Sequence, residues 1–270
     1  MKTQRIKSDS ISSERQIFIS GIAEYLIENH FSDEEMICPE VIADVYGISY
    51  SYGSYEDAFD GLLEYDNNEF HIYINTDRTL NHSRQRFTFA HELGHFFIDE
   101  HRNALANGQT PYHSSFTNFS SEILVEREAD FFAACLLMPR TRILNEYKQY
   151  KKFSISIINH ISKKYQTSFI STLFRLFYLD VHPLVIVYAK DGQVCWIMKS
   201  KDFRYYLRCK KPFIPENSIM YEYFKSGKKY TVTQQIWTGD WFYDRNEEKI
   251  YEYCWYYDRH KICYSIVWKD

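Results

Sequence analysis

Hydrophobic and polar positions change their spacing once along this chain, near residue 183. Before that point, apolar residues recur every three or four positions in several stretches, which predicts amphipathic helices. Beyond it, short apolar runs rich in Tyr and Trp predict antiparallel strands. The helices predicted from this pattern cover residues 12–30, 39–47, 86–98, 121–139, 155–165 and 169–179.

Strands with tight turns are predicted on both sides of that change. Asp66-Asn67-Asn68 and Asp191-Gly192 each lie between two apolar runs, which is the pattern of a β-hairpin. The predicted strands cover residues 48–55, 61–64, 69–75, 183–188, 193–198, 230–237, 249–255 and 262–268. The chain is therefore expected to be α+β. Its expected segments are 1–150, a helical segment at 151–182, and a mainly antiparallel β accessory domain at 183–270.

One predicted helix carries the sequence His91-Glu92-Leu93-Gly94-His95. Two histidines four positions apart lie on one face of a helix, so both ring nitrogens can reach one metal ion at about 2.0–2.1 Å. Glu92 is then placed beside the ion rather than on it. From there it can accept a proton from the water that attacks a peptide carbonyl. The apolar neighbours of this motif indicate a dry pocket, in which an ion's charge acts strongly.

The predicted helix at 121–139 supplies candidates for the remaining positions of a metal site. A catalytic zinc takes three protein ligands and leaves one position for water, and Glu126 is the candidate for the third ligand. Asp130, one turn later, can accept a hydrogen bond from His91 and fix the ring's tautomer. Glu128 is the competing ligand, but it points about 200° away from Glu126 around the helix. The alternative is that Glu126 and Asp130 form a solvated face.

These motifs together resemble the ImmA/IrrE family of metallopeptidases. The resemblance covers about half of the chain, in runs at Ala58–Gly61, Phe70–Asn75, Arg86–His95 and Glu126–Pro139. It implies a thermolysin-like helical core with a small sheet and one Zn²⁺ per chain. It also implies a protein substrate, typically a helix-turn-helix transcriptional repressor encoded on mobile elements or in stress-response loci. The family often has Asn at the position of Asp130, and either side chain can accept a hydrogen bond from histidine.

Two further parts of the first segment are candidates for contact with a substrate. In zinc peptidases with such a helix pair, the strand near the metal usually lies at the sheet edge, where a peptide can pair with it. The candidate strand is Phe70, His71, Ile72, Tyr73, Ile74 and Asn75, with an ordinary core strand as the alternative. Residues 101–120 are predicted to be a polar loop. Its Tyr112 and His113 are candidate donors to the oxyanion, or plain loop residues.

The predicted helices around Gln166-Thr167-Ser168 allow two interpretations. Two helices joined by a three-residue turn can form a helix-turn-helix, or they can be a packing hairpin. Lys163, Lys164 and Arg175 provide only a thin basic face, and the whole chain carries a net charge of −4, so direct DNA binding is disfavoured. We favour the packing hairpin.

The segment from 183 carries no catalytic constellation. It resembles the accessory region of some family members, which is GAF-like in one branch. The strand around Tyr251, Tyr253, Trp255, Tyr256 and Tyr257 offers a flat aromatic surface that suits a ligand or a partner. The alternative is that these rings pack inward.

We expect this protein to be cytoplasmic. Its N-terminus has no apolar segment typical of a signal peptide, and no apolar stretch approaches 18 residues, so no contact with a membrane is expected. The six cysteines are scattered over 270 residues and are expected to be reduced thiols.

Two functional hypotheses follow. The first is a zinc endopeptidase that acts on a repressor. The second is a regulator that keeps the metal site but works by binding protein or DNA.

Overall fold

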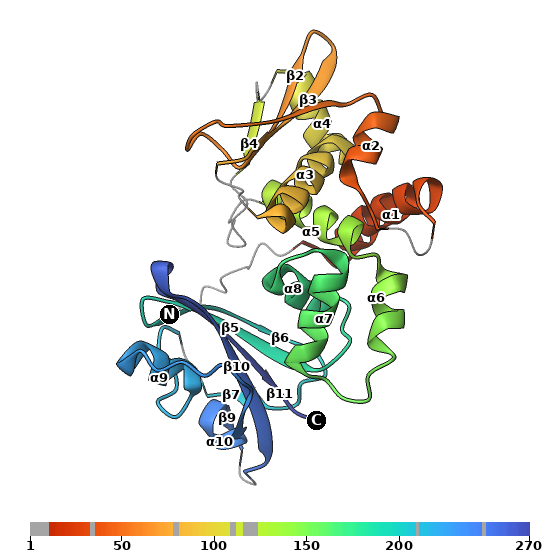
Figure 1. The fold of residues 1–270 in the computed structure, drawn as a ribbon. Coiled ribbons are helices and arrows are strands. Elements are labelled where there is room, and N and C mark those ends of the chain that lie inside the picture. The colour runs from red at the N-terminus through yellow and green to blue at the C-terminus, as the bar shows by residue number, and fades with distance from the viewer. Residues whose placement is uncertain are drawn as a thin grey trace, which may run out of the picture. The chain divides into compact units, whose positions relative to one another are not determined.

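A computed structural model describes residues 11–32, 36–77, 81–108, 124–208, 211–244 and 247–270, together with the backbone of 112–115. The chain is α+β and forms two compact units (Figure 1). The first unit consists of Met1–Glu146 and Asn159–Arg175, and the second of Tyr147–Ile158 and Leu176–Asp270. The helical segment expected at 151–182 is therefore divided between the two units.

The sheet of the first unit has four strands in the order β1-β3-β2-β4. β2 and β3 form the predicted hairpin, and Asn67 and Asn68 at its turn have φ values of 49° and 66°, as a two-residue hairpin turn requires. β1 is parallel to β3, whereas β4 is antiparallel to β2. The strands cover Ser49–Gly53 (β1), Gly61–Asp66 (β2), Glu69–Asn75 (β3) and Tyr112–Ser115 (β4).

The strand at Phe70–Asn75 is an inner strand, so its prediction as an edge strand is wrong. β3 pairs with β1 on one side and with β2 on the other, and Ile72 and Ile74 are fully buried. β2 follows β1 along the chain, but the two strands do not pair, because β3 lies between them in the sheet. Turn residues and alternating apolar positions are local features of the sequence, so they do not predict this order of strands in the sheet. In the described part of the chain, the two edges of this sheet are β1 and β4.

Helices cover the sheet and build the core of the first unit (Figure 1). α3 packs against β2 and β3, and α5 packs against both α3 and α1. The core includes Phe89, Leu93, Phe132 and Leu136, all fully buried. The helices are α1 (Ser13–His30), α2 (Pro39–Val45), α3 (His82–Phe97), α4 (Asp99–Ala106), α5 (Leu124–Leu137), α6 (Arg140–Tyr147), α7 (Ile155–Tyr165) and α8 (Phe169–Tyr178), of which α6, α7 and α8 each have residues in both units.

Two sequence-based expectations for these helices need correction. The loop predicted at 101–120 contains most of α4 and the strand β4. The apolar spacing over 12–30 predicts Ile17, Phe18, Ile22, Tyr25 and Leu26 on one side of the helix. The buried side of α1 instead includes Ile19, Ala23 and Leu26, while Ile17 and Tyr25 are exposed. Apolar residues lie on several sides of α1, so their spacing alone did not identify the buried one.

The basic face expected on α7 and α8 loses one of its three members. Arg175 is buried, and its guanidinium donates to the carbonyl oxygen of Met138 (2.9 Å) and to Sγ of Cys135 (3.0 Å). It therefore cannot contact a DNA phosphate in this conformation. Ile161 and Leu173 are also fully buried, as a packing role for both helices requires.

The second unit is built on a five-stranded antiparallel sheet in the order β6-β5-β11-β10-β8, which agrees with the predicted change to β structure. The hairpin at Asp191-Gly192 is confirmed, with φ values of 49° and 78°. A short ribbon of β7 and β9 and the helices α9 and α10 complete the unit. Its elements are β5 (Leu184–Lys190), β6 (Gln193–Lys199), β7 (Tyr206–Leu207), α9 (Ile219–Ser226), β8 (Gln234–Trp237), α10 (Thr238–Trp241), β9 (Phe242–Tyr243), β10 (Lys249–Tyr257) and β11 (Ile262–Trp268).

The aromatic surface expected on β10 is largely covered. Tyr251, Tyr253 and Trp255 are half-buried, and Tyr256 packs against the core of the second unit. Only Tyr257, at 39% exposure, is open to solvent. The inward-packing alternative therefore describes most of these rings better than an open binding face.

Glu252 is a fully buried carboxylate at the centre of the second unit. One oxygen accepts hydrogen bonds from the backbone N–H of Ile219 (3.1 Å) and from the indole of Trp241 (3.0 Å). The other accepts from the backbone N–H of Met220 (3.3 Å) and from the hydroxyl of Ser265 (2.7 Å). Burial raises the pKa of Glu252, and these donors act in the opposite direction. The carboxylate thus ties the first turn of α9 and α10 to the sheet.

Replacing Glu252 by Gln should destabilise the protein. The new amide group would point N–H donors at donors, so we expect a loss on the order of 2 kcal/mol in the free energy of unfolding. Chemical denaturation followed by tryptophan fluorescence measures it. The matched control is Glu216→Gln at an exposed position, where the free energy of unfolding should stay within about 0.5 kcal/mol. Equal effects at both positions would contradict the assigned role.

Gly94 allows α3 and α5 to approach each other closely. A Cβ atom at this position would lie 3.1 Å from the Cα of Ala129 and 3.2 Å from Cδ1 of Phe132. Because the Cα of Ala129 is backbone, an added methyl group would have to push the two helices apart.

Gly94→Ala should therefore lower the free energy of unfolding by about 1–3 kcal/mol through overpacking, despite the better helix propensity of alanine. Thermal unfolding followed by circular dichroism tests this. Gly21→Ala in α1 is the control, since a Cβ there would meet nothing within 4 Å. It should stabilise α1 by up to about 1 kcal/mol. A stabilising effect at both positions would show that the helices are not in close contact at Gly94.

Candidate metal centre

α3 places the two histidines of the motif on one buried face. The helix begins after Asn81, whose side chain accepts a hydrogen bond from the backbone N–H of Ser83 (2.9 Å). His91 and His95 follow one turn apart, at 1% and 0% exposure. Their Nε2 atoms lie 3.1 Å from each other. Two nitrogens bound to one tetrahedral ion at 2.0–2.1 Å would lie roughly 3.3 Å apart, so this spacing fits a shared ion.

Glu126, in the first turn of α5, completes a three-residue group. Its carboxylate oxygens lie 3.4 Å from Nε2 of His91 and 3.5 Å from Nε2 of His95. One ligand atom from each of the three residues lies within 4.8 Å of the others. Among the residues that the structure describes, no other set of histidine, cysteine and acidic side chains meets this condition. Two imidazoles and one carboxylate form a donor set typical of catalytic zinc sites.

Asp130 lies one turn after Glu126 and reaches His91 from the other side. Its Oδ1 atom is 2.8 Å from Nδ1 of His91. A proton on Nδ1 satisfies this hydrogen bond and leaves the lone pair of Nε2 directed towards Glu126 and His95. The structure therefore places Asp130 beside His91, where the sequence predicted it, and its role in orienting the ring stays a prediction.

The charges of the site also fit a bound cation. Burial alone would lower the pKa of His91, but hydrogen bonds to Asp130 and Glu126 outweigh it and raise this pKa to about 10. The surroundings thus favour positive charge at this point. The carboxylates of Glu126 and Asp130 face the two ring nitrogens of His91. A divalent ion at Nε2 of His91 would supply positive charge there.

Glu128 does not belong to this group, although it competed with Glu126 in the sequence. It is 5% exposed, and its carboxylate accepts from the guanidinium of Arg15 at 3.0 and 2.7 Å. Nε2 of His101 lies 3.1 Å from it on the same side. Glu128 therefore connects α5 with α1 and α4. Sequence reasoning did not identify Arg15 or His101, because α4 was not predicted and their contacts are not local.

Glu92 follows His91 in α3 and is fully buried. It is not part of the three-residue group, as expected for a proton acceptor beside an ion. Its carboxylate lies against β2, where a Cβ atom added to Gly61 would come within 2.5 Å of Oε1.

The two candidate oxyanion donors lie on β4. The backbone of Tyr112 pairs with Glu64 and that of His113 with Leu63, both on β2. The side chains of residues 112–115 are outside the part of the chain that the structure describes, so their role stays a prediction.

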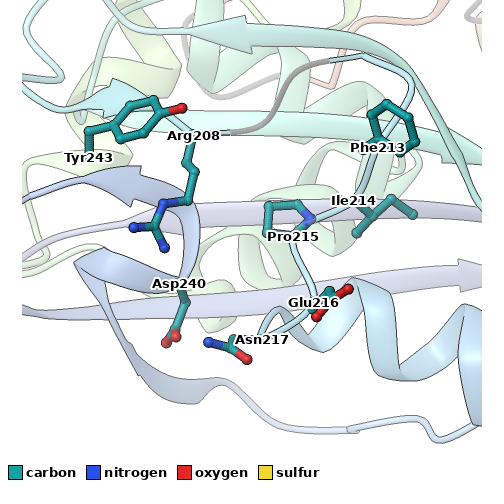
Figure 2. Close-up of a pocket in the computed structure, with 8 residues that line it drawn as sticks. All are labelled: Arg208, Phe213, Ile214, Pro215, Glu216, Asn217, Asp240 and Tyr243. Carbon is teal, nitrogen blue, oxygen red and sulfur yellow. The ribbon is translucent and has the colours of Figure 1, made fainter.

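The second unit contains a separate hollow of about 430 Å³ between the β7–β9 ribbon and the segment before α9 (Figure 2). Arg208 lies at one side, with its guanidinium carbon 5.6 Å from the ring centre of Tyr243 and one nitrogen donating to the carbonyl oxygen of Gly239 (2.9 Å). Phe213, Glu216 and Asp240 also line it. Among the described residues, no histidine or cysteine lines this hollow.

Three comparisons with known proteins bear on this geometry. The model of the IrrE N-terminal-like domain, the M78 peptidase family, matches residues 43–177, which is half of the chain. A search of curated proteins gave no match. A solved structure of a Mycobacterium tuberculosis transcriptional regulator is similar with a TM-score of 0.61 at 12% identity, over 95% of this chain and 78% of that one. At this identity the likeness concerns the fold alone.

The matched residues contain α3, α5 and the complete group of His91, His95 and Glu126. Family model, motif spacing and ligand geometry thus agree on the same part of the chain. This protein belongs to the ImmA/IrrE family of metallopeptidases.

Proposed function

We propose that this protein is a zinc-dependent endopeptidase. The observation that carries the proposal is the buried convergence of His91, His95 and Glu126, with Asp130 behind His91 and Glu92 beside them. Two imidazoles and one carboxylate would hold one Zn²⁺ per chain. The thermolysin-like character expected of the core belongs to this proposal, because it rests on the same pair of helices.

Zinc, when bound, would lower the pKa of water and polarise the carbonyl of the scissile peptide bond. Glu92 would take the proton of the attacking water and later deliver it to the leaving amine. Asp130 would hold the ring of His91 in the tautomer that directs Nε2 to the ion. The dry surroundings, including the fully buried Phe89 and Leu93, would strengthen each of these electrostatic effects.

A peptide substrate would pair with β4 rather than with β3. β3 has neighbours on both sides, whereas β4 pairs with β2 alone in the described part of the chain. Ser115 of β4 lies opposite Gly61 of β2, and Gly61 lies against Glu92. Backbone pairing with β4 would thus hold an extended segment one strand away from the general base.

The proposed substrate is a helix-turn-helix transcriptional repressor, as the family resemblance implies. Such a substrate would be met in the cytoplasm. None of the described helices is both long and apolar enough to cross a membrane.

A non-proteolytic regulator is the second candidate. Two observations favour it: the second unit has no group of metal ligands among its described residues, and the similar structure is titled a transcriptional regulator. The buried Arg175 and the net charge of −4 make binding of a partner protein the better form of this hypothesis than binding of DNA.

Replacing Glu92 by Gln should abolish cleavage and leave the metal in place. The amide cannot accept the proton, so we expect hydrolysis to fall at least about 10²-fold. Wild-type and variant protein are incubated with a lysate, and newly formed protein N-termini are identified by mass spectrometry. Cleavage sites found only with the wild type support an endopeptidase. Function in cells that persists in Glu92→Gln would instead favour the regulator.

The ligand assignment is tested by a matched pair of glutamates on α5. Glu126→Gln should reduce zinc content well below one ion per chain, whereas Glu128→Gln should keep one ion per chain, because Glu128 is bound to Arg15 and His101. Glu128→Gln is expected to lower the melting temperature through loss of the ion pair. Plasma mass spectrometry of the purified proteins measures the metal. Zinc lost from Glu128→Gln but kept in Glu126→Gln would overturn the assignment.

A further inference from the structure

Gly61, the first residue of β2, lies in contact with the carboxylate of Glu92. A Cβ atom built on Gly61 would lie 2.5 Å from Oε1 of Glu92 and 2.5 Å from Cγ2 of Thr88. Both distances are much shorter than any ordinary contact of a methyl group. The backbone of Gly61 is not in the left-handed region, so glycine is needed here for space and not for conformation. Since Glu92 is fully buried, its carboxylate has little room to move away.

The segment before Gly61 is fixed by the side chain of Asn75. The amide nitrogen donates to the carbonyl oxygens of Glu56 (2.8 Å) and Phe59 (2.7 Å). The amide oxygen accepts from the backbone N–H groups of Tyr55 (3.3 Å) and Asp77 (3.1 Å). Asn75 is fully buried and uses both ends of its amide, so it holds the loop between β1 and β2 in one conformation.

Asp60 connects the same segment to the helix that carries Glu92. Its carboxylate accepts from the guanidinium of Arg84 at 2.6 Å, and its backbone oxygen accepts from the N–H of Asn75 at 3.0 Å. Arg84, Thr88 and Glu92 follow at intervals of four and therefore lie on one face of α3. That face meets residues 60 and 61 at three successive turns of the helix.

We propose that Gly61 is the positioning residue of Glu92, and that the loop held by Asn75 and by the Asp60–Arg84 pair sets the position of Gly61. The missing side chain lets the carboxylate rest on the α-carbon, which defines the distance of Glu92 from the three-residue group. The inference rests on the proposed function, in which Glu92 moves the proton. It adds a strand and a loop, both remote from the metal ligands in sequence, to the parts that determine the reaction rate.

Gly61→Ala tests this directly. The substrate is a quenched fluorescent peptide that spans a cleavage site identified in the lysate experiment. A displaced general base should lower kcat by about 10²-fold and change KM less than about threefold, because a misplacement of 1 Å has an effect of this size. Zinc content should remain one ion per chain, and the absorption spectrum of the cobalt-substituted protein should stay as in the wild type. An unchanged kcat would overturn the inference.

Thr88→Ser separates positioning from general crowding. It removes the methyl group that a Cβ on Gly61 would meet, and it keeps the hydroxyl group. In Gly61→Ala/Thr88→Ser, we expect the melting temperature to recover only in part and kcat to stay low, since the contact with Glu92 is still there. Recovery of both would show that Gly61 is only a packing residue and would overturn the inference.

A cycle in metal-free protein gives a readout that does not depend on catalysis. Gly61→Ala should lower the melting temperature by at least about 3 °C when residue 92 is Glu. In the background Glu92→Ala, the same substitution should lower it by less than half as much, because the carboxylate that it meets is gone. An equal decrease in both backgrounds would mean that residues 61 and 92 are not coupled, which would overturn the inference.

Asn75→Asp examines the loop without adding any atom near Glu92, and it serves also if Gly61→Ala does not fold. The carboxylate is the same size but cannot donate to Glu56 and Phe59. We expect a lower kcat with zinc retained, and wild-type kcat would overturn the role of the loop. Glu92→Gln distinguishes a failure of the proposed function from a failure of the inference about Gly61. If it stays active, the proposed function fails; if it is inactive while Gly61→Ala is fully active, only the present inference fails.

Discussion

The close packing of α3 against α5 is the constraint on which the metal centre depends. The histidines belong to one helix and Glu126 to the other, so the three-residue group exists only if the helices approach within a few ångströms. Gly94 lies between His91 and His95 and permits this approach, since even a methyl group there would meet the backbone of Ala129. The motif on α3 therefore contains the two histidines and also Gly94, the small residue that allows α5 to pack closely against α3. A buried cation would in turn hold the two helices together, because it relieves the repulsion among their carboxylates.

A second group of contacts surrounds this packing without including His91, His95 or Glu126. Glu128, on the side of α5 away from Glu126, binds Arg15 of α1 and His101 of α4. Asp60 and Asn75 hold the loop that leads to Gly61, on the opposite side of α3. The position of Glu92 is thus determined by a strand, and that of Glu126 by a helix with its own ion pair. This arrangement explains how a centre made of so few residues can be rigid before any ligand binds.

The candidate ligands could be predicted from the sequence because each motif is local. A spacing of four on one helix places His91 beside His95, and the same spacing on another places Asp130 one turn from Glu126. The hairpin turns at Asn67-Asn68 and Asp191-Gly192 were predictable for the same reason, since the residues at the turn determine its backbone. What the sequence did not reveal depends on pairs that are distant along the chain. The place of β3 between β1 and β2, the contact of Gly61 with Glu92 and the burial of Glu252 all arise when separate elements meet. An acidic residue such as Glu252 gives no sequence signal that four donors from three elements will surround it.

The central claim is that one buried cation lies between α3 and α5, held by the three residues that converge there. A crystal structure of the zinc-loaded protein, with anomalous data collected on both sides of the zinc absorption edge, tests this claim most directly. The account predicts one anomalous peak per chain, at about 2.0–2.2 Å from Nε2 of His91, Nε2 of His95 and a carboxylate oxygen of Glu126. Asp130 should remain on Nδ1 of His91, and Glu92 should lie beside the ion without binding it. A peak at any other group of side chains, or zinc coordinated by Glu128 or Glu92 in place of Glu126, would contradict the account.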